Sequence, residues 1–307
     1  MPKVVFLLVP DVHLLEIAAP AQVFSTAADI GLAYTLCYVS EQPRVTTVQG
    51  VALTADIQWP DLDREDLLIV PGWRGPTRMI GAATAERLRA HHAAGGTVAS
   101  VCAGADTLGR AGLLDGRRCT THHTIQEELA RRYPAATVVR DVLYVSDDRV
   151  VTCAGAASAG DLALHLLSTR HGPSAASTVA RTLVAHSWRD GADDQESVAL
   201  RYRSHLDEAV HRVQNLIGSR FAERLPLRVL AAEAGCSPRT VTRQFQQATG
   251  ITPLAYQQSL RLQRAEHLMQ RGATAEAAAR QVGFVDGRML RRLRSRATQG
   301  TTTDDTA

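Results

Sequence analysis

TVASVCAGADTLGRAGLLDGRRCTTHHTIQEEL, residues Thr97 to Leu129, decides the fold of the first part of the chain. An apolar run ends at Cys102, and small residues separate it from the next amphipathic stretch. This order predicts a buried strand, a sharp turn that carries the cysteine, and a helix, the arrangement called a nucleophile elbow. Ser100, Ala103 and Gly104 suit the limited room at such a turn. A thiol there lies near a helix N-terminus, where the helix dipole favours the thiolate.

Strands and helices alternate through the first 187 residues. Continuous apolar runs predict strands covered on both faces, and they read KVVFLLVP, AYTLCYVS, DLLIVPG, TVASVC and RVVTCAG. The helical stretches between them read EIAAPAQVFSTAADI, TAERLRAHHAAGG, TIQEELARRYP and SAGDLALHLLSTRHG. A hairpin is predicted around Asp147 and Asp148. We therefore expect an α/β domain with a mostly parallel sheet and a ligand site at the carboxyl ends of its strands.

The cysteines and the apolar runs indicate a cellular compartment. The chain has five cysteines, and none forms a CxxC pair, so a disulfide framework is not expected. The apolar run at the start is too short for a signal peptide, and Asp11 interrupts it. No run approaches the length that spans a membrane. We expect a reduced, cytoplasmic protein that has no membrane partner.

Charge is distributed unevenly along the chain. Residues 201–296 contain 17 arginines and seven acidic residues, a net charge of +10, whereas residues 1–200 have a net charge of −5. A basic region of this kind favours a polyanion as its partner. A solvated arginine-rich surface is the alternative, but such surfaces seldom concentrate so heavily in one domain.

The basic region contains a helix-turn-helix pattern. Apolar residues recur at helical spacing, Gly235 suits the left-handed residue that ends a helix, and Ser237 and Pro238 suit the start of the next one. Val241, Phe245 and Ala248 are expected to face inward, and Leu227, Leu230, Ala231 and Ala234 form the apolar row of the first helix. Arg239, Thr240, Thr242, Arg243 and Gln246 are the candidate DNA-binding residues of the second helix. The alternative is a surface helix of an ordinary bundle.

A second copy of this pattern follows. It has a helix, Gly283, Asp286 as a helix cap, and a basic helix with Arg288, Arg291 and Arg292 as further candidate DNA-binding residues. PLAYQQSLRLQRAEHLMQ between the copies is one long amphipathic helix. Two units joined in this way are expected to enter two successive major grooves on one face of the duplex.

Roughly the last hundred residues resemble the AraC/XylS family of transcription regulators, most specifically in ATGITPLAY. The second unit departs from that family. An aromatic residue is usual four positions after Leu290, where this chain has Arg294, and the usual glycine–threonine–proline turn is replaced by ATQGTTTDDTA. We expect Leu293 to fill the place of the missing aromatic residue and the last helix to be frayed.

The first domain resembles the PfpI-type, class I glutamine amidotransferase-like domain in EIAAP, VPGW, SVCAGA and AGAASAGDLALHLL. The resemblance implies a flavodoxin-like sandwich and a pocket around the elbow cysteine. It places Cys102 and Ala103 at the elbow, Glu16 beside the thiol, and His122 at a position where several relatives have a histidine. Gly72 and Trp73 correspond to a loop that offers backbone N–H groups to an oxyanion. Two alternatives remain, because His123 could face the pocket and Glu16 could cap its own helix.

Together the two domains resemble the GlxA-type regulators, in which a PfpI-like domain precedes an AraC-type domain. The expected organisation is an effector-sensing domain at 1–187, a linker at 188–206, a DNA-binding domain with two helix-turn-helix units at 207–296, and a polar tail at 297–307. The expected partners are operator DNA, a small-molecule effector, RNA polymerase and a second copy of the chain. No metal and no cofactor are expected.

Cys102 supports two hypotheses. In the first, it is a reactive thiol of low pKa that lines an effector pocket and turns over no substrate, because a sensor needs only differential binding. In the second, the domain is a cysteine-dependent hydratase or amidase, and the DNA-binding domain is secondary.

Overall fold

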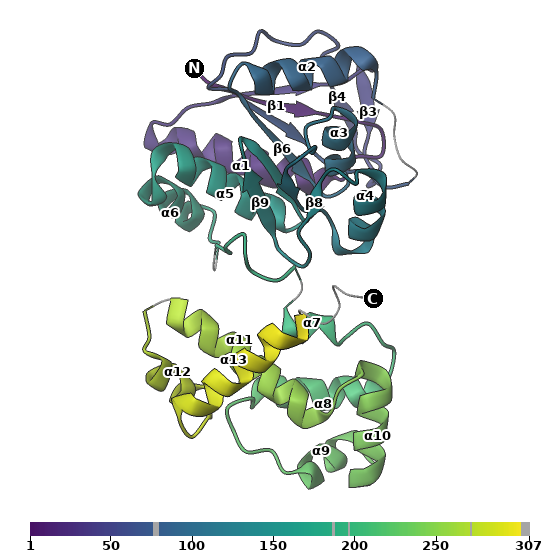
Figure 1. Cartoon of the computed structure of the whole chain (residues 1–307), viewed down its shortest axis with the longest axis vertical. Helices are drawn as coiled ribbons and strands as arrows, with labels where there is room; N and C mark the ends of the chain where they lie inside the picture. Colours follow the sequence, from purple (N-terminus) through teal and green to yellow (C-terminus); the bar gives the residue numbers. More distant parts are fainter. Residues whose placement is uncertain (76–79, 186–187, 196, 271, 302–307) are drawn as a thin grey trace. The chain divides into compact units, whose positions relative to one another are not determined.

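The structure is a computed structural model that describes residues 1–75, 80–185, 188–195, 197–270 and 272–301. The chain divides into two compact units, Met1–Gln195 and Glu196–Ala307. The first unit is an α/β sandwich and the second is built from helices alone in its described part (Figure 1). Both predictions of fold class are therefore confirmed. None of the helices in the described ranges is long and apolar enough to cross a membrane.

A six-stranded sheet forms the centre of the first unit. Its order is β2 (Thr35–Val39), β1 (Lys3–Leu7), β5 (Leu67–Val70), β6 (Thr97–Val101), β10 (Val150–Cys153) and β9 (Tyr144–Asp147). All neighbours are parallel except β10 and β9. The central strands are buried almost without interruption, because helices cover both faces. The continuous apolar runs of the sequence are thus the strands that they predict.

Two layers of helices cover the sheet (Figure 1). One layer packs on the core that contains Phe6, Phe24 and Leu162, and it consists of α1 (Leu14–Thr26), α5 (Ser158–His171) and α6 (Pro173–Thr182). The other packs on the core that contains Leu68, Leu88 and Leu108, and it consists of α2 (Ala82–Ala93), α3 (Gly104–Arg110) and α4 (Gln126–Arg132). The smaller elements are η1 (Ala27–Ile30), η2 (His123–Ile125) and the paired strands β3 (Arg44–Thr46) with β4 (Ala52–Thr54) and β7 (Arg118–Cys119) with β8 (Thr137–Val138).

The predicted hairpin is present at the edge of the sheet. Asp148 and Arg149 join β9 to β10, and both have positive φ, 43° and 60°. A two-residue hairpin turn of type I′ needs positive φ at both of its central residues. The backbone twist of such a turn matches the twist of the two paired strands. Here residues other than glycine meet this requirement.

Seven helices lie in the described part of the second unit. They are α7 (Val198–Arg201), α8 (Glu208–Ser219), α9 (Leu227–Ala234), α10 (Pro238–Thr249), α11 (Pro253–Gln270), α12 (Ala275–Gln281) and α13 (Gly287–Thr301). They enclose two separate cores. Val213, Ile217, Phe245 and Tyr256 lie in the first core, and a smaller second core forms around Phe284. Each core belongs to one helix-turn-helix unit.

The stretch expected to be a linker, 188–206, is divided between the two units. The side chain of Arg189 binds Asp161 of α5 with an Nη2–Oδ2 distance of 2.6 Å, and Gln195 Nε2 donates to the carbonyl of Thr121. Val198 and Tyr202 pack into the first core of the second unit. Likewise α13 continues to Thr301, into the expected polar tail, and residues 302–307 lie outside the described residues.

Candidate functional site

Cys102 occupies a sharp turn between β6 and α3. Its φ is +54°, and its backbone N–H donates to the carbonyl of Cys153 at 2.9 Å. The surroundings require small residues: a Cβ on Gly104 would lie 2.1 Å from the Val70 carbonyl oxygen, and one on Gly155 would lie 2.7 Å from Cys102 Cβ. A cysteine whose backbone is in the left-handed conformation, placed between a parallel strand and a helix, has the geometry of a nucleophile elbow.

Glu16 lies buried beside this turn, only 1% exposed. One carboxyl oxygen accepts the N–H of Gly72 at 2.7 Å, and the other accepts the N–H of Ala156 at 3.2 Å. The carboxyl group is also within hydrogen-bonding reach of the Cys102 thiol. Glu16 therefore joins three segments around the cysteine, and both of its carboxyl oxygens accept hydrogen bonds from other loops instead of capping its own helix.

Gly72 cannot serve as the oxyanion donor that the sequence suggests, because its N–H is engaged by Glu16. A glycine is needed at this position for a steric reason. A Cβ at this position would lie 2.8 Å from both Cys102 Cβ and the Ala103 nitrogen. The glycine thus allows the loop after β5 to approach the elbow closely.

The expectation of a low pKa for Cys102 is wrong. Burial raises the pKa of the Cys102 thiol, and the neighbouring Glu16 raises it further. The N–H of Ala103 lowers it, but this effect is the smaller one. Burial also raises the pKa of Glu16, although its two backbone hydrogen bonds oppose the change. Burial and the closeness of the two groups therefore disfavour a charge on both of them at once.

The elbow opens on a cavity of about 390 Å³. Cys102, Ala103, Trp73 and His122 line it, as the resemblance predicts. His122 is the pocket histidine, because His123 is exposed and absent from the lining. Glu16 and Gly72 stand behind the wall and do not line the cavity.

Sequence patterns alone missed several polar groups of this cavity. His13, Arg74, Asp106, Glu128 and Arg132 also line it. Arg132 of α4 bonds Asp106 of α3 at 2.5 Å, and Arg110 bonds the same carboxylate at 2.9 Å. Asp106 could have been suspected, since it lies one helical turn after the elbow. Nothing in the sequence indicates that Arg132 reaches it, because only the packing of α4 against α3 brings them together.

The first helix-turn-helix unit has the predicted turn chemistry. Gly235 ends α9 with a φ of 70°, and Ser237 Oγ caps α10 by accepting the N–H of Thr240 at 3.2 Å. Val241 and Phe245 are fully buried. Leu227 differs from the prediction, since it is 39% exposed at the first turn of α9, where the core no longer covers it.

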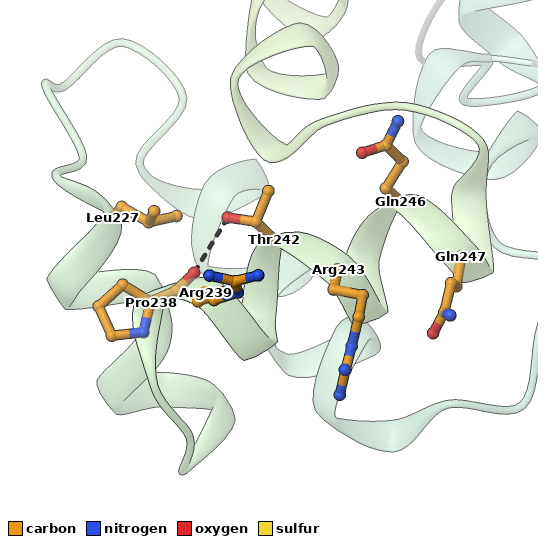
Figure 2. A pocket seen from close by; sticks show the side chains of 7 residues that line it. All are labelled: Leu227, Pro238, Arg239, Thr242, Arg243, Gln246 and Gln247. Carbon is orange, nitrogen blue, oxygen red and sulfur yellow. Dashed lines mark hydrogen bonds between the residues drawn. The ribbon is translucent and has the colours of Figure 1, made fainter.

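The outer face of α10 is a shallow hollow of about 500 Å³ (Figure 2). The predicted residues Arg239, Thr242, Arg243 and Gln246 line it, together with Leu227, Pro238 and Gln247. Figure 2 shows Arg243 and Gln247 extending to one side of the helix and Thr242 and Gln246 to the other. The Thr242 hydroxyl donates to the Pro238 carbonyl at 3.0 Å. Thr240 is partly buried at the cap and lies outside the hollow.

The second unit repeats this architecture in α12 and α13. Gly283 has a φ of 82°, and Asp286 Oδ1 accepts the N–H groups of Arg288 and Met289 at 2.9 and 3.1 Å. The predicted DNA-binding residues Arg288, Arg291 and Arg292 are all exposed on α13.

The departure at Arg294 is accommodated at the surface. Leu293 packs against the second core, as expected, while the Arg294 guanidinium lies outside it and pairs with Glu266 at 3.4 Å. The expected fraying is not seen, since α13 remains helical to Thr301. A charged residue is tolerated at this position because its guanidinium group stays exposed to solvent.

Comparison with known proteins agrees with this geometry. The sequence profile of the DJ-1/PfpI family matches residues 2–169, which include both Cys102 and Glu16. The chain belongs to the DJ-1/PfpI family. A helix-turn-helix domain profile matches residues 230–303, so the DJ-1/PfpI domain is joined to a second, AraC-type domain.

Relatives of this DJ-1/PfpI chain include regulators and an enzyme. The HTH-type transcriptional regulator CdhR of Pseudomonas aeruginosa is 29% identical over 228 residues, 74% of this chain and 67% of that protein. The isonitrile hydratase of Pseudomonas putida is 32% identical over 162 residues, 52% of this chain and 68% of the enzyme. The crystal structure of an AraC family transcriptional regulator from Pseudomonas putida matches 60% of this chain and all of that chain, with a TM-score of 0.53 and 25% identity.

Proposed function

We propose that the chain is a transcription regulator that reads operator DNA with α10 and senses a small molecule in the Cys102 cavity. The observation that carries the proposal is the outer face of α10. A capped second helix presents two arginines and two glutamines on a surface hollow, and all four side chains are exposed. This is the residue chemistry that reads base edges in the major groove.

The side chains of α10 suggest individual roles. The exposed guanidinium groups of Arg239 and Arg243 suit a guanine edge or a phosphate, and the amide of Gln246 suits an adenine edge. Arg288, Arg291 and Arg292 of α13 supply positive charge for a second contact with the duplex. The net charge of +10 over residues 201–296 supports binding to a polyanion.

The cavity beside Cys102 is the proposed effector site. It is open to solvent, large enough for a small metabolite, and lined by both charged and apolar side chains. An effector acts by binding two states of the protein unequally, and this needs no turnover. We further propose a cytoplasmic homodimer, with RNA polymerase as an additional partner.

Arg243 provides a direct test on a DNA fragment selected by the wild-type chain. If Arg243 reads a guanine, Arg243→Ala weakens binding by about 1–3 kcal/mol and relaxes the base preference at one position. If it contacts a phosphate, all sequences bind more weakly and the slope of log K against log salt falls by about 1. The matched control is Arg181→Ala, which removes one exposed arginine from α6. Unchanged affinity and salt slope in Arg243→Ala would refute its assignment to the DNA surface.

A cysteine-dependent hydratase is a second candidate, favoured by the 32% identity to isonitrile hydratase and by the elbow at Cys102. The raised thiol pKa and the engaged N–H of Gly72 oppose it. Turnover of an isonitrile by the full chain, lost in Cys102→Ser, would establish the enzyme. Absence of turnover together with sequence-specific DNA binding supports the regulator.

A further inference from the structure

One arginine near the middle of α11 holds two distant loops of the second unit. The guanidinium of Arg261 donates from Nε to the Phe221 carbonyl at 2.6 Å and from Nη2 to the Glu223 carbonyl at 2.8 Å. Its third nitrogen, Nη1, donates to the Gly283 carbonyl at 2.8 Å. Phe221 and Glu223 belong to the loop before α9, whereas Gly283 lies in the turn between α12 and α13. A single side chain thus connects the two helix-turn-helix units.

Neighbouring contacts reinforce this connection. One turn earlier on α11, Gln257 is 6% exposed and its Nε2 donates to the same carbonyls of Phe221 and Glu223 at 2.9 and 2.8 Å. The two loops also touch directly, because a Cβ on Gly283 would lie 1.9 Å from the Ala222 carbonyl oxygen. The Arg261 guanidinium covers the ring of Phe284 at 5.5 Å.

Arg261 acts in this contact through the directions of its hydrogen bonds and not through pairing with an opposite charge. All three hydrogen bonds of the Arg261 guanidinium go to backbone carbonyls, and among the described residues it forms no ion pair with a carboxylate. Burial accordingly lowers the pKa of Arg261. A planar guanidinium with donors fixed in a fork can satisfy three carbonyls in one arrangement only, whereas a lysine has a single ammonium on a flexible stem.

We propose that Arg261 is a positioning residue that fixes the spacing and phase of α10 relative to α13, so that the protein selects DNA by the distance between two half-sites. The inference rests on the proposed function, because it concerns how the same DNA surface is held. When the geometry of two linked binding units matches their sites, avidity exceeds either affinity by roughly 10²–10⁴-fold. A rigid connection confines that gain to one spacing.

The test uses the full chain and a duplex selected from a random-sequence pool by the wild-type protein. Two derivatives are made, one with one base pair inserted between the half-sites and one with the α13 half-site scrambled. Affinities are measured for the wild type, Arg261→Ala, Arg261→Lys and the control Arg264→Ala, whose exposed side chain lies on the same helix. Circular dichroism confirms that each variant is helical.

The wild type and Arg264→Ala should bind the inserted duplex about as weakly as the scrambled one, a loss on the order of 10²-fold. Arg261→Ala and Arg261→Lys should bind the original duplex more weakly and should lose only a few-fold more on insertion. A variant that is merely less stable has a smaller active fraction on every duplex, so the ratio between duplexes stays at the wild-type value. That unchanged ratio would overturn the proposal.

The wild-type measurements alone distinguish failure of the proposed function from failure of the proposed role of Arg261. If it selects no sequence, the proposed function fails. If it selects a sequence but binds the original and inserted duplexes equally, or selects only one half-site, the proposed function stands and the role of Arg261 is refuted. These outcomes hold even where both Arg261 variants fail to fold.

Discussion

At Cys102, backbone geometry and electrostatics act in opposite directions. The left-handed turn presents the sulfur to the cavity, as a nucleophile requires, yet burial and Glu16 keep the thiol protonated. The turn could be predicted from the small residues around Cys102. The pKa could not, because it depends on Gly72 and Ala156 holding a buried carboxyl group beside the sulfur. A sensor pocket is compatible with an unreactive thiol.

Glu16→Gln tests the electrostatic effect of the carboxyl group on the thiol. Because the charge of Glu16 raises the pKa of the thiol, the amide variant should ionise at lower pH and react faster with iodoacetamide at Cys102 at a given pH. In the wild type, the rate should stay low until the pH exceeds the ordinary thiol range, about 8.5. Alkylation rates against pH, read by mass spectrometry, provide the measurement.

Glu86→Gln is the control for this experiment, since Glu86 forms an exposed ion pair on α2 and should leave the rate profile unchanged. A wild-type thiol that titrates at or below the ordinary value would contradict the electrostatic account of the elbow. So would a Glu16→Gln profile that coincides with the wild-type profile.

At the scale of helices and strands, features that depend on adjacent residues are the ones that the sequence predicts best. Gly235, Ser237 and the hairpin at Asp147 and Asp148 each depend on a few adjacent residues, and each is predictable from the sequence. Leu227 and the end of α13 are not, because the position of the core boundary and the persistence of a helix depend on distant packing. The division of 188–206 between the two units cannot be predicted from the sequence for the same reason. Arg189 and Asp161 are far apart in the sequence and form their hydrogen bond only in the folded structure.

Ser237 gives a prediction at this scale. Removing its hydroxyl in Ser237→Ala leaves the N–H of Thr240 without its cap, which should lower the free energy of unfolding of the second unit by about 1 kcal/mol. Urea denaturation followed by circular dichroism at the helical band measures this change. Ser204→Ala, at an exposed position outside the helices, should differ little from the wild type. An equal loss in both variants would mean that the cap contributes nothing specific.

At the scale of the whole molecule, the proposed function joins a small-molecule site in one unit to a DNA surface in the other. The alternating apolar runs and the concentration of arginine are enough to indicate both units from the amino-acid sequence. Their coupling is a matter of free energy between two sites and is reciprocal, so an effector that weakens DNA binding must itself bind more weakly to the DNA complex.

Cys102→Ser tests this coupling. A metabolite that raises the melting temperature of the first unit is identified by thermal-shift screening and then titrated into the DNA complex. Cys102→Ser should keep the DNA affinity measured without metabolite, and should lose or shift the response to it, because the serine changes only the cavity wall. Identical responses of wild type and variant in fluorescence anisotropy would remove Cys102 from the effector site.

Selection of DNA fragments from the native genome by the full chain tests the central claim most directly. Bound fragments are sequenced at near-physiological salt, and the same selection is repeated with Arg239 and Arg243 both changed to alanine. We predict that the wild type enriches a few fragments sharing one motif with two half-sites, and that the variant loses the enrichment of the half-site read by α10. Fragments with no common motif, or the same motif enriched equally by the variant, would contradict the assignment of α10 as the DNA-reading element.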